Sequence, residues 1–92
     1  MLFNALLRKR NTNLKRALAA GVKARRTELS LSLGEFAERA GLSTAVLTSI
    51  ENATSNPNLA TIVRIAAVLR CDPAALFAPV QKYITGEGSS SP

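Results

Sequence analysis

Short polar side chains recur along one face of a predicted helix that follows Ser43. The apolar Val46, Leu47 and Ile50 recur at helical spacing and are assigned to the buried side of this helix. The face that remains consists of Thr44, Ala45, Thr48, Ser49 and Asn52. Hydroxyl and amide groups hydrogen-bond base edges and phosphates, and alanine or threonine methyl groups contact the thymine methyl. The pattern favours a helix that reads the DNA major groove, and the alternative interpretation is an ordinary solvated face.

The residues before this helix predict a sharp turn between two helices. Phe36, Ala37 and Ala40 form an apolar stripe. Gly41 is expected to end that helix in the left-handed conformation that glycine adopts without strain. Ser43 is then a favourable N-cap for the next helix. This order and spacing are typical of a helix-turn-helix.

The elements on either side are predicted from the same signals. Thr12 or Asn13 is expected to cap a first helix that buries three apolar residues and has Gly21 as a mild weak point. Asn58 is expected to cap a later helix, and Asp72 with Pro73 to begin another. The expected core positions are Leu14, Leu18 and Val22 in the first helix and Leu59, Ile62, Val63, Ala66 and Leu69 in the later one.

The basic residues are concentrated in the amino-terminal third of the chain. The 92 residues have a formal net charge of +6, and residues 1–30 contain eight basic side chains against one acidic side chain. Neutralising phosphates supplies much of the non-specific affinity for DNA, so this third is the expected source of such contacts. The basic side chains are Arg8, Lys9, Arg10, Lys15, Arg16, Lys23, Arg25 and Arg26.

Three interpretations of residues 1–12 stay open. The segment could be a basic arm in which Arg8, Lys9 and Arg10 follow the DNA backbone or enter the minor groove. It could instead be a short amphipathic helix that packs on a partner subunit, or a disordered tail. A signal peptide or a membrane anchor is not expected. The basic cluster follows the apolar residues, and no apolar run reaches the roughly 20 residues that span a bilayer.

The sequence resembles the phage repressor and Cro-type, or XRE-type, helix-turn-helix family. The likeness covers residues 18–77, about two thirds of the chain. It implies five short helices, of which the second and third form the reading head and the third lies in the major groove. Besides the motif, the residues that carry the resemblance are Val22, Arg26, Leu29, Leu31, Asn56, Pro57, Asn58, Leu59, Ile62, Ile65, Ala66, Leu69, Leu76 and Phe77.

The resemblance also implies roles for individual residues. Arg26 and Glu51 would form a structural ion pair that fixes the orientation of the helices. The base-facing residues would be Thr44, Ala45, Thr48 and Ser49. The basic side chains of Lys23 and Arg25 and the backbone N–H groups from Ala53 to Ser55 are expected to contact phosphate. Further expected phosphate contacts are Ser32, Ser43, Asn52, Thr54 and Ser55.

The chain departs from the family pattern at three places. Leu33 stands where the family often has a glutamine that contacts phosphate. Ala53 stands where a glycine usually follows the third helix. A left-handed alanine costs about 1 kcal/mol more than a glycine, so Asn52 is expected to adopt that conformation instead. The reading face has no Arg, Lys or Gln, so sequence discrimination is expected to be modest or to depend on DNA shape.

Apolar residues near both ends of the chain are candidates for a dimer contact. Val80, Tyr83 and Ile84 recur at helical spacing and, with the amino-terminal leucines, have little monomer core left to enter. A two-fold DNA site would need such a dimer. The alternative is that these residues fold back on the first helix.

An enzyme, a cofactor and a metal site are not expected. The sequence has no His, so it lacks an imidazole base, and its single Cys71 has no clustered partner for zinc or a disulfide. Cys71 is expected to be a small buried residue.

The sequence therefore predicts an all-α, five-helix repressor-like bundle over residues 13–85, with an arm at residues 1–12 and a flexible tail at 86–92. The expected function is sequence-specific binding of double-stranded DNA, as a homodimer in the cytoplasm, to repress transcription. The alternative is a protein-interaction module of the same fold, antitoxin-like or adaptor-like, with weak or no DNA reading.

Overall fold

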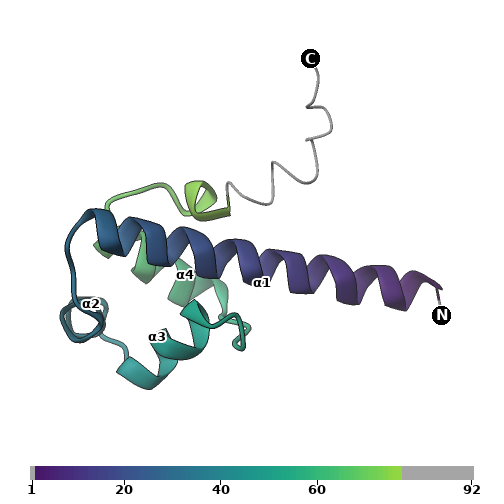
Figure 1. The fold of residues 1–92 in the computed structure, drawn as a ribbon, viewed down its shortest axis with the longest axis horizontal. Helices are drawn as coiled ribbons and strands as arrows, with labels where there is room; N and C mark the ends of the chain where they lie inside the picture. Colours follow the sequence, from purple (N-terminus) through teal and green to yellow (C-terminus); the bar gives the residue numbers. More distant parts are fainter. Residues whose placement is uncertain (1, 78–92) are drawn as a thin grey trace, which may run out of the picture.

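The computed structural model describes residues 2–77, which form four α-helices and one 3-10 helix (Figure 1). Helix α1 spans Leu2–Glu28, α2 spans Leu33–Ala40, α3 spans Thr44–Glu51 and α4 spans Leu59–Val68. The 3-10 helix η1 spans Pro73–Phe77. The all-α class is confirmed. The predicted segment with Val80, Tyr83 and Ile84, and the tail at residues 86–92, lie outside the described residues.

The count of five α-helices is wrong for residues 2–77. The fifth helix begins where expected, because Asp72 Oδ1 accepts a hydrogen bond from the backbone N–H of Ala74 at 3.0 Å. It is, however, a five-residue 3-10 helix. Such short runs close with i to i+3 bonds, as the 2.8 Å bond from Ala75 N–H to the Asp72 carbonyl does.

Helix α1 begins at Leu2 and not after Thr12 or Asn13, so residues 2–12 continue the first helix without a break. Residues 2–16 contain no Gly or Pro and consist largely of Leu, Ala, Arg and Lys, which are good helix formers. The isolated Asn and Thr are weak signals against that background. Of the three interpretations of residues 1–12, the helical one therefore describes residues 2–12. Whether this helix packs on a partner subunit stays a prediction.

The core lies where the carboxyl-terminal half of α1 packs against α3 and η1, while α2 packs against α3 and α4, and α4 against η1 (Figure 1). Its largest fully buried side chains are Val22, Phe36, Leu47, Ile50, Ile65, Leu69 and Leu76. Of the residues predicted in the core on α1 and α4, three are exposed instead: Leu14 at 43%, Leu59 at 74% and Val63 at 50%. Leu14 lies on the amino-terminal part of α1, which projects beyond the core. Helix α4 packs through Ile65, Ala66 and Leu69, which rotates Leu59 and Val63 outward.

Gly21 allows η1 to approach α1 closely. A Cβ atom at this position would lie 2.1 Å from the carbonyl oxygen of Leu76, which is backbone and cannot turn away. The prediction that Gly21 is only a weak point of the helix missed this contact. Close approach of two backbones is a common reason for glycine inside a helix.

All four α-helices end in the same way. Each is followed by a residue with positive φ, namely Ser30, Gly41, Ala53 and Arg70. In each case the next residue donates its N–H to a carbonyl five positions earlier, as Thr54 does to Ser49 at 2.9 Å. This is the Schellman motif. The expectation that Asn52 replaces Ala53 in the left-handed conformation is wrong, because Asn52 has φ −94° and Ala53 has φ 61°.

Within residues 2–77, no helix has the length and apolar character needed to cross a bilayer. The same residues bring together no group of three or more His, Cys, Asp or Glu that could hold a metal ion. Cys71 is half-buried at the edge of the core, and burial raises the pKa of its thiol.

Candidate nucleic-acid interface

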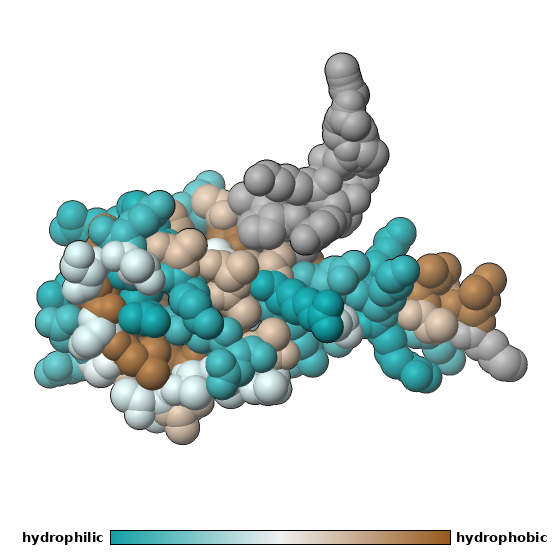
Figure 2. Space-filling model, viewed as in Figure 1, coloured by the Kyte–Doolittle hydropathy of each residue, from teal (hydrophilic) through white to brown (hydrophobic). Residues whose placement is uncertain are grey.

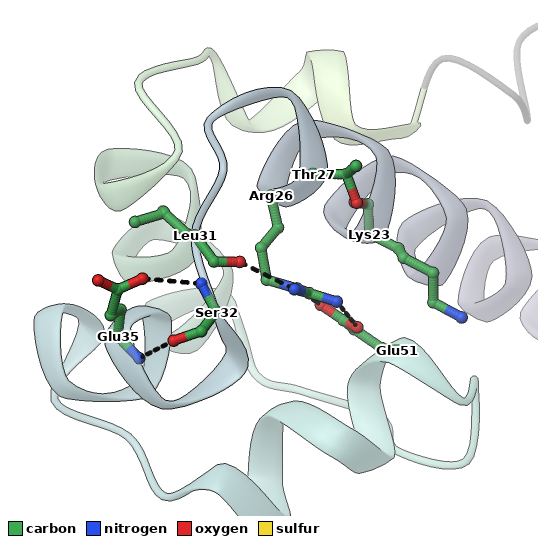
Figure 3. A network of polar contacts seen from close by, with 7 residues as sticks. All are labelled: Lys23, Arg26, Thr27, Leu31, Ser32, Glu35 and Glu51. Atoms are coloured by element: carbon green, nitrogen blue, oxygen red, sulfur yellow. Dashed lines mark hydrogen bonds and ion pairs between the residues drawn. The ribbon is translucent and has the colours of Figure 1, made fainter.

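The α2–turn–α3 unit is built from two capped helices. Ser32 and Glu35 form a capping box, in which Ser32 Oγ accepts from Glu35 N–H at 3.0 Å and Glu35 Oε1 accepts from Ser32 N–H at 2.9 Å (Figure 3). The bond from the Ser32 backbone lowers the pKa of the Glu35 carboxyl. Ser43 caps α3 as predicted, its Oγ accepting from Val46 N–H at 3.1 Å. Because both serine hydroxyls act here as acceptors, each keeps a proton that it can donate to a phosphate.

Helix α3 presents a short-chained, uncharged face to solvent. Its buried side consists of Leu47, Ile50 and Glu51. Thr44, Ala45 and Thr48 are exposed and Ser49 is half-buried. The Ser49 hydroxyl donates to the Val46 carbonyl at 2.8 Å, so that proton is already bound within the helix. The four predicted base-facing residues therefore differ in how available their side chains are to DNA. The freely exposed hydroxyls are those of Thr44 and Thr48.

Val46 lies at the edge of this exposed face, where periodicity predicted a core residue. The prediction treated Val46, Leu47 and Ile50 as one buried stripe, but the stripe is centred on Leu47, Ile50 and Glu51. The charged Glu51, which hydrophobic periodicity does not mark, takes the place in the buried stripe that was predicted for Val46. The exposed Val46 methyl groups add an apolar contact to the surface of α3.

Arg26 and Glu51 join α1 to the end of α3. Arg26 Nε donates to Glu51 Oε2 at 2.7 Å and Nη2 donates to Oε1 at 3.0 Å (Figure 3). The third nitrogen, Nη1, donates to the Leu31 carbonyl at 2.9 Å. The Glu51 side chain is only 7% exposed. The hydrogen bond to Glu51 raises the pKa of Arg26, so the guanidinium keeps its charge. The pair holds α3 at a set angle to α1.

Lys23 and Arg25, which were predicted to contact phosphate together, lie on different sides of α1. Arg25 Nε donates to the Leu69 carbonyl at 2.8 Å, and its Nη1 pairs with Glu28 at 3.0 Å. The structure thus gives Arg25 a different role, which is to fasten α1 to the end of α4. Lys23 is exposed and extends on the side of α1 that faces the end of α3 (Figure 3).

The loop after α3 offers side chains more than backbone donors. Asn52 is exposed and Ser55 is half-buried, which leaves their side chains open to a phosphate. Thr54 is exposed too, but its hydroxyl donates to the Ser49 carbonyl at 3.2 Å. The N–H groups of Ala53 and Thr54 already donate to the carbonyls of Ile50 and Ser49. The expectation that the backbone from Ala53 to Ser55 holds a phosphate is therefore wrong for these two groups, because the helix end uses them.

Arg8, Lys9 and Arg10 lie on the exposed part of α1, beyond the core. Figure 2 shows the hydrophilic surface of this projection and the apolar side chains gathered at its far end. Leu33, at the first position of α2, packs against the core cluster. It therefore has a packing role at the position where the family often has a polar contact.

Comparisons with known proteins agree with this geometry. Residues 22–76 match a family model described as helix-turn-helix, HTH_3. Among solved structures, the chain is similar to an HTH_3 family transcriptional regulator from Vibrio cholerae, with 32% sequence identity and a TM-score of 0.72. The match covers 84% of this chain and 43% of that one, so this chain spans less than half of the length of that structure. No curated protein matches.

Proposed function

Because the chain belongs to the XRE-type helix-turn-helix family, we propose that it binds double-stranded DNA in a sequence-dependent way and represses transcription by covering promoter sequence. The observation that carries this proposal is the exposed face of α3, with Thr44, Ala45 and Thr48 turned outward. Side chains of this kind contact base edges and thymine methyl groups in the major groove. The Arg26–Glu51 pair supports it, because it anchors the end of α3 while leaving that face open.

Phosphate contacts around this face are proposed for residues at the two helix starts and in the loop after α3. The hydroxyl protons of Ser32 and Ser43, and the side chains of Asn52, Thr54 and Ser55, are of the type that binds phosphate. Lys23 adds a positive charge on the same side of α1 as Arg26. Such contacts fix the register of the reading helix but do not read sequence.

A homodimer is proposed for binding to a two-fold site. The amino-terminal leucines Leu2, Leu6 and Leu7 are exposed on α1, as a subunit contact would need. Sedimentation or light scattering of the full chain measures the subunit number directly. A monomer at all protein concentrations, on and off DNA, would remove this part of the proposal.

The alternative is a protein-interaction module of the same fold. It is favoured by the exposed Leu59 and Val63 on α4, and by the structural use of Arg25, which takes one cation away from DNA. Exposed apolar side chains that lie together are typical of a surface for a protein partner.

The two functions are separated by selecting fragments from random-sequence DNA with the full chain. The wild type and a control in α4, Thr61→Ala, are expected to enrich one common sequence, and Thr44→Ala/Thr48→Ala is expected to lose that preference while keeping non-specific affinity. Thr44 and Thr48 are both exposed and alanine favours helices, so the fold should be preserved in this variant. If the wild type enriches no sequence, specific reading is rejected and the protein-interaction alternative gains.

A further inference from the structure

Helix α1 projects well beyond the core. Every residue from Leu2 to Leu14 is exposed, and the first buried residue is Ala17. At a rise of about 1.5 Å per residue, residues 2–16 extend roughly 20 Å past the domain. Figure 1 shows this half of α1 running away from the other helices. A helix this exposed can contact a partner along its length.

Three of the basic residues of α1 share one side of the helix. Lys9, Arg16 and Lys23 are spaced seven residues apart, which returns to nearly the same side of a helix after two turns. We call these three residues the basic stripe. All three are exposed, and neither ion pair in residues 2–77 includes them. Arg10 falls on another face, beside Phe3 and Leu6.

The basic stripe begins at Lys23, beside the reading unit, and by Lys9 it has turned about 100° around α1 from the side of Arg26. Arg26, one turn after Lys23, contacts Glu51 at the end of α3. Figure 3 shows Lys23 on that side as well. Arg16 and Lys9 follow at steps of about 10 Å along the helix axis. The stripe thus begins beside the end of α3 and leads away from it.

We propose that the basic stripe binds the phosphate backbone of the DNA that flanks the sequence read by α3. This inference rests on the proposed DNA binding and adds to it a second contact on α1. Charge complementarity identifies the partner, because residues 2–27 include no acidic side chain and duplex DNA carries a phosphate every 3.4 Å on each strand. A stripe about 20 Å long lengthens the bound site by roughly six base pairs, without regard to their sequence.

The test compares two variants that remove the same charge. Lys9→Ala/Arg16→Ala removes two residues of the stripe, and Arg10→Ala/Arg70→Ala removes two exposed arginines outside it. Affinity for the selected site is measured as a function of salt, on DNA with and without eight flanking base pairs, a length of about the stripe's reach. Circular dichroism verifies the helix content of each variant.

The stripe variant is expected to lower the slope of log affinity against log salt by about two, since each phosphate contact contributes about 0.9. It should also lose the gain in affinity that flanking DNA gives the wild type, while the control keeps that gain and both keep the selected sequence. Equal slope changes in the two variants, or a wild type indifferent to flanking DNA, would overturn the proposal. A wild type that binds no DNA overturns the proposed function too, so the two failures are distinguishable.

Discussion

Arg26 and Glu51 meet in two parallel hydrogen bonds of 2.7 and 3.0 Å, although they are 25 residues apart in the chain. The same guanidinium also binds the Leu31 carbonyl in the turn that leads into α2. One side chain of α1 therefore positions both helices of the reading unit. Because the pair is largely removed from water, its effect depends strongly on whether one or both partners are present.

Removing only Arg26 should destabilise the protein more than replacing both partners. Arg26→Met leaves the Glu51 carboxylate without its cation, and we expect a loss of about 2–3 kcal/mol, less than for a fully buried pair because the Arg26 side chain is 20% exposed. Arg26→Met/Glu51→Leu should cost less than Arg26→Met alone. Urea unfolding at neutral pH measures both. A double variant at least as unstable as Arg26→Met alone would contradict the coupling.

Gly21→Ala should destabilise the protein, although it adds only one methyl group. The added methyl group would press on the Leu76 carbonyl, so η1 must move, and we expect a cost of about 1–3 kcal/mol. Gly34→Ala is the matched control, since its Cβ would meet nothing closer than Ser32 Oγ at 4.0 Å. That change should be neutral or stabilising by up to about 1 kcal/mol. Thermal unfolding of the two variants decides whether the contact with η1 explains the glycine.

Ala53→Gly should stabilise the protein by roughly 0.5–1 kcal/mol. Ala53 has φ 61°, which strains a residue with a Cβ but not a glycine. Ala20→Gly places the same change at an exposed position inside α1, where it should cost about 1 kcal/mol. The midpoints of denaturant unfolding should therefore move in opposite directions. A loss of stability in both variants would mean that the strain at Ala53 is negligible.

The capping box should make stability depend on pH through Glu35. Its folded pKa is lowered, so its contribution is fully present above the ordinary glutamate pKa of about 4.3 and is lost as the pH falls through the lower folded value. The difference in melting temperature between wild type and Glu35→Gln should therefore shrink from pH 6 to pH 3. Glu38→Gln, on the same helix but outside the cap, controls for the loss of one negative charge. A difference for Glu35→Gln that stays constant with pH would rule out this role of the carboxylate.

The parts of the fold that depend on neighbouring residues were predictable. Gly41, Ser43, Asn58 and Asp72 each signal a helix end or start through a bond to a residue a few positions away, and all four occur where expected. Propensity also explains the one large error in a boundary. Residues 2–16 favour a helix throughout, and this outweighs the cap signal at Thr12 or Asn13.

The parts that depend on which face of a helix meets the core were less predictable. Leu14, Leu59 and Val63 fit a helical stripe but lie outside the core, because the stripe does not reveal where a neighbouring helix ends. The chemistry of Arg25 and Arg26 illustrates the same limit. They are adjacent in the sequence, yet one binds the end of α4 and the other the end of α3. Only the packed arrangement separates their roles.

The length of α1 gives the molecule two levels of stability within one helix. From Ala17 onward, unwinding the helix would expose core side chains, whereas the exposed half can unwind at little cost, since a helix of about 15 residues is marginal alone. Backbone amides near Leu6 should therefore exchange with deuterium far faster than those near Val22, and trypsin should cut first after Arg8 to Arg16. A bound partner would slow both processes over that half alone, so local protection would report occupancy of the projection without any change in the core.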